Sequence, residues 1–106
     1  MAHVGARVRR GAERNTASGK LADAELHFSG GELDGLKLIG FRVWSRQDGK
    51  RLVTFPARQF TVDGERRSFS LLRAVENPAA QARLRDFVMQ AYLADVQEEI
   101  EDVATS

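Results

Sequence analysis

The sequence contains no cysteine, which excludes disulfide bonds and zinc sites built on thiolates. This absence also fits a reducing compartment. No apolar run approaches the roughly 18 residues that a membrane-spanning helix needs. The N-terminal residues include positive charges but lack the apolar stretch of a secretory signal. We therefore predict a cytoplasmic protein without a membrane segment.

Groups that carry catalytic or metal-binding chemistry are also scarce. The two histidines, His3 and His27, lie far apart in the sequence, whereas a zinc site needs three or four suitably spaced ligands. No serine is accompanied by a recognisable base, and no Lys-Ser/Thr follows Gly30-Gly31 as a phosphate loop requires. Asp23 and Glu25 lie on the polar side of a predicted strand, where we expect them to be solvated. These observations predict no enzyme activity, no metal, no cofactor and no small-molecule substrate.

Charge is nearly balanced over the 106 residues, with 16 Lys and Arg against 15 Asp and Glu, but its distribution is uneven. Residues 1–20 carry five bases and one acid, whereas residues 78–106 carry two bases and six acids. Such asymmetry orients a protein on an anionic polymer. Chance clustering of charges on a solvated surface explains the pattern equally well.

Alternation of apolar and polar residues predicts a series of antiparallel strands. Asp63-Gly64 stands between two β-forming segments and predicts a tight hairpin, because both central residues of a type I′ turn need positive φ. Pro56 ends the strand before it because proline has no N–H to donate. We expect a loop at 11–19 and strands near 4–8, 20–28, 36–46, 51–55, 60–62 and 65–72.

The period changes after Asn77, a suitable N-cap, and Pro78, a suitable first helical residue. Apolar residues then recur at helical spacing, which predicts a helix over 78–93 that packs on the sheet. The predicted fold class is therefore α+β, with an antiparallel β-sheet of about five strands and one C-terminal helix on one face. Across this interface we expect Leu84, Phe87, Val88 and Ala91 to meet Ile39, Phe41, Val43 and Phe69.

The predicted organisation is a single domain over residues 20–93. A basic segment, 1–19, precedes it and contains a first strand. An acidic extension of the helix, or an acidic tail, follows over residues 94–106.

A basic and aromatic surface is the strongest functional signal. Arg42, Trp44 and Arg46 alternate on one face of a strand, and an aromatic ring between guanidinium groups suits base stacking with phosphate contacts. Trp44 equally suits a structural role at a sheet edge or in a dimer interface. More arginines follow on the hairpins, and the predicted nucleic-acid-binding residues are Arg42, Trp44, Arg46, Arg58, Arg66 and Arg67.

Five short segments occur in the order and near the spacing seen in one bacterial family: Ala6-Arg7-Val8-Arg9-Arg10, Gly19-Lys20-Leu21-Ala22-Asp23-Ala24, Phe55-Pro56-Ala57-Arg58, Asp63-Gly64-Glu65-Arg66-Arg67 and Gln90-Ala91-Tyr92. Together they resemble the stage V sporulation protein G (SpoVG, septation regulator) family over residues 6–93. Phe55 and Ala57 replace a Met and a Ser of that family. Leu72-Arg73 stands where the family has His-Pro, and Leu38-Ile39-Gly40 replaces its Val-His-Asp strand, so the chain is similar to a divergent member.

The resemblance implies a small, dimeric bacterial regulator of septation and gene expression that binds DNA or RNA. We expect the homodimer to form by pairing of edge strands, because an open sheet leaves unpaired backbone groups. The alternative is a dimeric protein–protein interaction module without affinity for nucleic acid.

Overall fold

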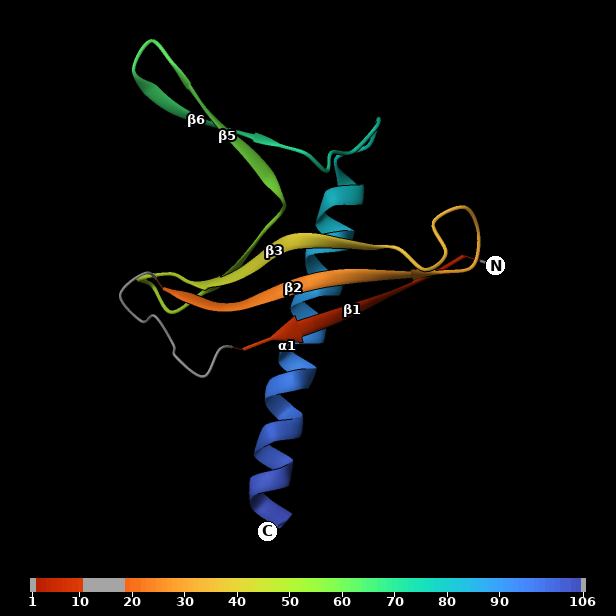
Figure 1. Cartoon of the computed structure of the whole chain (residues 1–106). Coiled ribbons are helices and arrows are strands. Elements are labelled where there is room, and N and C mark those ends of the chain that lie inside the picture. The colour runs from red at the N-terminus through yellow and green to blue at the C-terminus, as the bar shows by residue number, and fades with distance from the viewer. Residues whose placement is uncertain (1, 11–18, 106) are drawn as a thin grey trace.

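The computed structural model describes the backbone of residues 2–10 and 19–105 and the side chains of residues 2–10 and 19–98. The predicted loop at 11–19 therefore lies almost entirely outside the described residues. The described residues form six strands and one helix (Figure 1), which are β1 (His3–Arg9), β2 (Lys20–Ser29), β3 (Lys37–Ser45), β4 (Arg51–Thr54), β5 (Ala57–Val62), β6 (Glu65–Ser70) and α1 (Ala79–Thr105).

The strands belong to two sheets. β1, β2, β3 and β4 form an antiparallel sheet in that order, and β5 and β6 form a separate two-stranded sheet. Figure 1 shows α1 crossing one face of the four-stranded sheet and continuing beyond it toward the C-terminus. The predicted α+β class, with antiparallel strands and a C-terminal helix on one face, is confirmed.

The core lies between the four-stranded sheet and α1. Phe41 and Val43 of β3 and Val88 of α1 are completely buried, at 0% exposure. The ring of Phe55 meets that of Phe41 edge to face, with 5.5 Å between centroids. Strand alternation brings small and branched side chains of neighbouring strands to the same face, so that the buried cluster consists of Ala22, Ala24, Leu26, Phe41, Val43, Val53, Val88 and Tyr92.

A β-bulge at Gly40 changes the face that part of β3 presents. Ala24 pairs with Phe41, but the next residue of β2, Glu25, pairs with Ile39, so that Gly40 is an extra residue. Gly40 has φ of +108°, and a Cβ there would lie 3.1 Å from the Cβ of Pro56. The predicted burial of Ile39 in the core is therefore wrong. The extra residue turns its side chain to the other face, where it is 63% exposed.

Helix α1 begins as the sequence predicts but packs along a narrower stripe. The backbone N–H of Ala79 donates to Asn77 Oδ1 over 3.0 Å, which caps the first turn. Val88 and Tyr92 are buried, whereas Phe87 is 40% exposed. The predicted burial of Phe87 and Phe69 against the sheet is wrong, because Phe87 lies beside the contact stripe and Phe69 belongs to the separate β5–β6 sheet.

The helix continues beyond the predicted 78–93 segment to Thr105, through the part for which the sequence left a helical extension or a tail open. Near its middle, Arg10 Nε donates to Asp95 Oδ2 over 2.6 Å and ties α1 to the residue that follows β1. None of the described residues forms a helix that is both long and apolar enough to cross a membrane.

Candidate nucleic-acid interface

β5 and β6 form a hairpin that projects from the rest of the protein, and we call residues 57–70 the hairpin arm. Asp63 and Gly64 at its tip have φ of 51° and 80°, as a type I′ turn requires. The predicted Asp-Gly hairpin is therefore confirmed. Every arm residue except Ser70 is exposed, and Figure 1 shows the arm extending away from the four-stranded sheet and α1.

The two faces of the arm differ in chemistry. Residues that are directly paired across antiparallel strands share one face. On one face, which we call the mixed face, arginines alternate with apolar side chains in the pairs Arg58–Phe69, Phe60–Arg67 and Val62–Glu65. The opposite face, the polar face, carries the pairs Ala57–Ser70, Gln59–Ser68 and Thr61–Arg66.

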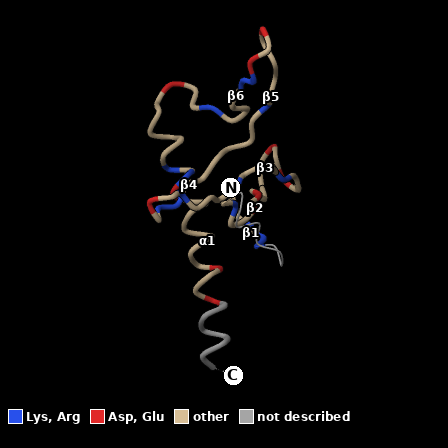
Figure 2. The backbone as a smooth tube through the Cα atoms, turned by 90° about the vertical axis from the view of Figure 1, so that its left-hand side faces the viewer, with Lys and Arg blue, Asp and Glu red and all other residues tan. Residues whose placement is uncertain are grey.

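The three predicted arm residues are therefore divided between these faces. Arg58 and Arg67 lie on the mixed face and Arg66 lies on the polar face. Arg67 Nη2 is 3.6 Å from Glu65 Oε2, whereas no carboxylate among the described residues pairs with Arg58 or Arg66. Figure 2 shows basic positions along the arm with acidic positions toward its tip. The arm can therefore offer two unpaired guanidinium groups to an anionic partner.

The other three predicted residues lie on or next to β3, away from the arm. Arg42 Nε is 3.8 Å from Asp23 Oδ1, so that this guanidinium already faces a carboxylate. The Nε1–H of Trp44 donates to Thr54 Oγ1 over 2.8 Å, which fixes a half-buried indole ring. Arg46 is exposed in the turn between β3 and β4, where its N–H donates to the carbonyl of Lys50 over 2.7 Å. The six residues thus form two separate groups.

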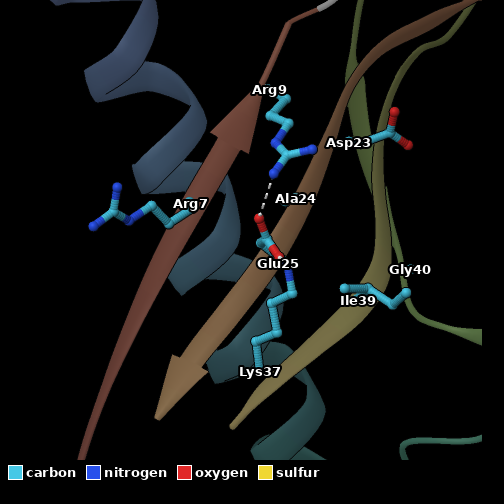
Figure 3. A pocket seen from close by; sticks show the side chains of 8 residues that line it. All are labelled: Arg7, Arg9, Asp23, Ala24, Glu25, Lys37, Ile39 and Gly40. Carbon is cyan, nitrogen blue, oxygen red and sulfur yellow. Dashed lines mark hydrogen bonds and ion pairs between the residues drawn. The ribbon is translucent and has the colours of Figure 1, made fainter. Parts of the chain in front are cut away.

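The face of the four-stranded sheet that α1 leaves open contains a buried carboxylate, which sequence reasoning missed. Glu25 is only 8% exposed. Its Oε1 accepts from Arg9 Nη2 over 3.3 Å and its Oε2 is 3.2 Å from Lys37 Nζ (Figure 3). The expectation that Glu25 is solvated is wrong, because long basic side chains of the neighbouring strands cover it. These two partners lie on two other strands, so that no local sequence pattern indicates the contact.

These contacts change the acidity of Glu25. The hydrogen bond from Lys37 lowers the pKa of the carboxyl below its ordinary value of 4.5, and the charges of Lys37 and Arg9 and the contact with His27 act in the same direction. Burial acts in the opposite direction and comes second only to the Lys37 hydrogen bond, but the contacts that lower the pKa together outweigh it. A cavity of about 400 Å³ lies beside the carboxylate on this face.

We expect Glu25→Gln to change how stability depends on pH. Because the pKa of Glu25 is lowered in the folded state, its ionised form stabilises the fold above about pH 4.5, and this contribution is lost as the pH falls through the folded-state pKa. The variant should be less stable than wild type at pH 7. It should also lack the part of the stability loss at low pH that protonation of Glu25 causes. Urea denaturation between about pH 7 and pH 3 measures both effects, with exposed Glu65→Gln as the control. If the free energy of unfolding of Glu25→Gln fell with decreasing pH as steeply as that of wild type, this role of Glu25 would be contradicted.

Among protein-family models, curated proteins and solved structures, none matches this chain. The similarity to the SpoVG family therefore stays a prediction that depends on the five sequence segments. No residue can be assigned a function by alignment with a matched protein. The candidate interface is therefore defined by the geometry of the arm and of β3.

Proposed function

We propose that this protein is a small SpoVG-like regulator that binds DNA or RNA through the hairpin arm, in the bacterial cytoplasm, and affects septation or gene expression. The observation that supports this proposal is the exposure of Arg58, Arg66 and Arg67 on a ribbon that projects from the rest of the described chain. The lack of cysteine fits the proposed compartment. The proposal requires neither a cofactor nor a metal.

The shape and chemistry of the arm suit a polyanion. A guanidinium group presents several N–H donors that match phosphate oxygens, and a two-stranded ribbon is narrow enough to enter the major groove of a duplex. On the mixed face, Phe60 and Phe69 stand next to arginines, and aromatic rings of this kind stack on the bases of single strands. The arm therefore has contacts for either form of nucleic acid.

If this proposal holds, β3 supplies a second contact region, formed by Arg42, Trp44 and Arg46. The Trp44 N–H is already used by Thr54, so that this residue would interact with nucleic acid through the face of its ring rather than through a hydrogen bond. Asp23 reduces the attraction that Arg42 exerts on a phosphate. The arm is accordingly the main binding element and β3 the weaker one.

A protein–protein interaction module is the second candidate. Exposed apolar side chains favour it, above all Phe87 of α1 and Leu33 in the loop between β2 and β3, which line one groove. The two candidates differ in whether the purified protein binds nucleic acid.

Titration of the purified protein with labelled single-stranded and duplex nucleic acid, at increasing salt, tests the proposal. We expect log affinity to fall linearly with log salt, with a slope of about −0.9 per phosphate contact for duplex and about −0.7 for single strands. Absence of binding to both forms at about 50 mM salt would exclude the nucleic-acid proposal and leave the interaction module.

A further inference from the structure

The cavity beside Glu25 lies on the face of the four-stranded sheet that α1 leaves open (Figure 3). Its volume is about 400 Å³, and its charged lining consists of Arg7 and Arg9 of β1, Asp23 and Glu25 of β2 and Lys37 of β3. Cavities of about 300–1,000 Å³ with a few convergent polar groups are typical small-molecule sites. None of the six predicted nucleic-acid-binding residues lines this cavity, so that it is separate from the candidate nucleic-acid interface.

The bases that hold Glu25 carry more positive charge than this carboxylate balances. Arg9 Nη2 is 3.3 Å from Glu25 Oε1, and Lys37 Nζ is 3.2 Å from Glu25 Oε2. The two bases come from the strands on either side of β2 and bind different oxygens of one carboxylate, which fixes both beside the cavity. One positive charge of this group of three therefore stays unbalanced.

Arg7 adds a second unbalanced charge. It is directly paired with Glu25 across β1 and β2, so that both residues share the open face of the sheet. Arg7 is exposed and forms no ion pair with a carboxylate of the described residues. Its side chain lies at the outer side of β1 (Figure 3) and can rotate toward a ligand, because no described acidic group holds it.

The second carboxylate of the lining, Asp23, does not cancel this positive charge. Asp23 Oδ2 is 2.7 Å from Lys20 Nζ, and Asp23 Oδ1 is 3.8 Å from Arg42 Nε. Each of the two carboxylates thus has two basic partners of its own. Among the described residues, the lining and its ion-pair partners comprise five bases and two acids, which attracts an anion to the cavity.

The unbalanced charge matches a phosphate group. A phosphate monoester carries about two negative charges at pH 7 and has three acceptor oxygens. Guanidinium and ammonium groups are the usual donors to phosphate oxygens, and such charge-assisted hydrogen bonds are the strong ones. A carboxylate ligand carries one negative charge and would leave part of the positive charge at Arg7, Arg9 and Lys37 unbalanced.

The β-bulge gives the same cavity an apolar wall. Ile39 lines the cavity and is 63% exposed, because the extra residue Gly40 turns its side chain to the open face. Bulges of this kind often redirect a side chain next to a functional site. An exposed branched side chain beside basic groups suits a ligand that has a ring or another apolar portion in addition to its phosphate.

We propose that this cavity binds a small phosphorylated molecule. The phosphate lies between Arg7, Arg9 and Lys37, and the ring or apolar portion of the ligand packs against Ile39. The proposal concerns binding and includes no reaction. It does not depend on the proposed binding of nucleic acid, which uses the arm and the other part of β3.

NMR titration of the purified wild-type protein tests the site directly. Inorganic phosphate, AMP and adenosine serve as probes, with sodium chloride holding the ionic strength constant. Phosphate and AMP should cause saturable shifts of the backbone amide signals of Arg7, Glu25 and Lys37. AMP should bind more tightly than phosphate because its ring system contacts Ile39, and adenosine should bind at least about tenfold more weakly than AMP because it lacks the phosphate.

Three variants separate the contributions to binding. Arg7→Ala should weaken binding of both AMP and phosphate by about tenfold, because it removes a charge-assisted hydrogen bond. Arg66→Ala removes an exposed guanidinium from the arm and is the matched control, which should bind both probes as wild type does. Ile39→Ala should weaken AMP binding about fivefold and leave binding of inorganic phosphate unchanged. All three side chains are exposed, so that each variant should keep its circular dichroism spectrum.

Several results would overturn the proposal. One is the absence of saturable binding of both phosphate and AMP by wild type at up to about 10 mM. Another is an equal loss for Arg7→Ala and Arg66→Ala, because the attraction would then come from net charge alone. A third is a loss of nucleic-acid affinity in Arg7→Ala as large as its loss of AMP affinity, because the cavity would then belong to the nucleic-acid surface.

Discussion

Phe41→Ala is expected to lower the free energy of unfolding by about 3–5 kcal/mol. Phe41 belongs to β3 and is completely buried in the cluster between the sheet and α1. Its ring also meets the ring of Phe55 edge to face. Its truncation removes apolar contacts and leaves a cavity that the neighbouring strands cannot close. Because domains of this size are stable by about 5–15 kcal/mol in total, the variant should be close to unfolding at room temperature.

Ile39→Ala is the matched control for this prediction. Ile39 lies two residues from Phe41 on the same strand, where ordinary alternation would bury both, but the bulge at Gly40 leaves it 63% exposed. Its truncation should change the free energy of unfolding by no more than about 0.5 kcal/mol. Urea denaturation followed by circular dichroism measures both variants. Similar losses for Ile39→Ala and Phe41→Ala would show that the bulge does not turn Ile39 away from the core.

Replacement of Arg66 and Arg67 together by alanine is expected to weaken nucleic-acid binding by at least about tenfold at about 50 mM salt. Each guanidinium that contacts a phosphate releases counterions, so that the salt slope should become less steep by about 1.8 for duplex or about 1.4 for single strands. The loss should be similar for all sequences, because phosphate contacts carry no base information. Both side chains are exposed on the arm, and the fold should be unaffected.

A control double variant separates a local contact made by the arm from a general effect of the protein's net charge. Arg7→Ala with Lys50→Ala removes two positive charges from exposed positions outside the arm and outside the six predicted residues. This control should reduce affinity only slightly and leave the salt slope nearly unchanged. Equal losses for the two double variants would show that the arm has no special role and would remove the main support for the proposed function.

Features with local causes could be predicted from the sequence. The alternation in 20–28 and 36–46 indicates β2 and β3 because side chains of a strand alternate between its faces. Asp63-Gly64 indicates the hairpin because these residue types tolerate positive φ. Asn77 and Pro78 indicate the start of α1 because they satisfy or remove N–H groups that have no partner within the helix. The class, α+β, follows from the order of these elements.

Features that depend on distant partners were decided only by the tertiary structure. Gly40 becomes a bulge through its pairing with β2 and its contact with Pro56, and this turns Ile39 out of the core. Glu25 is buried because Arg9 and Lys37, from two other strands, cover it. The candidate arginines are divided because β5 and β6 pair only with each other and leave the main sheet. The sequence by itself determines the periodicity of the strands and the helix and the positions of the turns, because these depend on neighbouring residues. Strand register, burial and the grouping of surface residues depend on contacts between residues far apart in sequence, and no local pattern specifies such contacts.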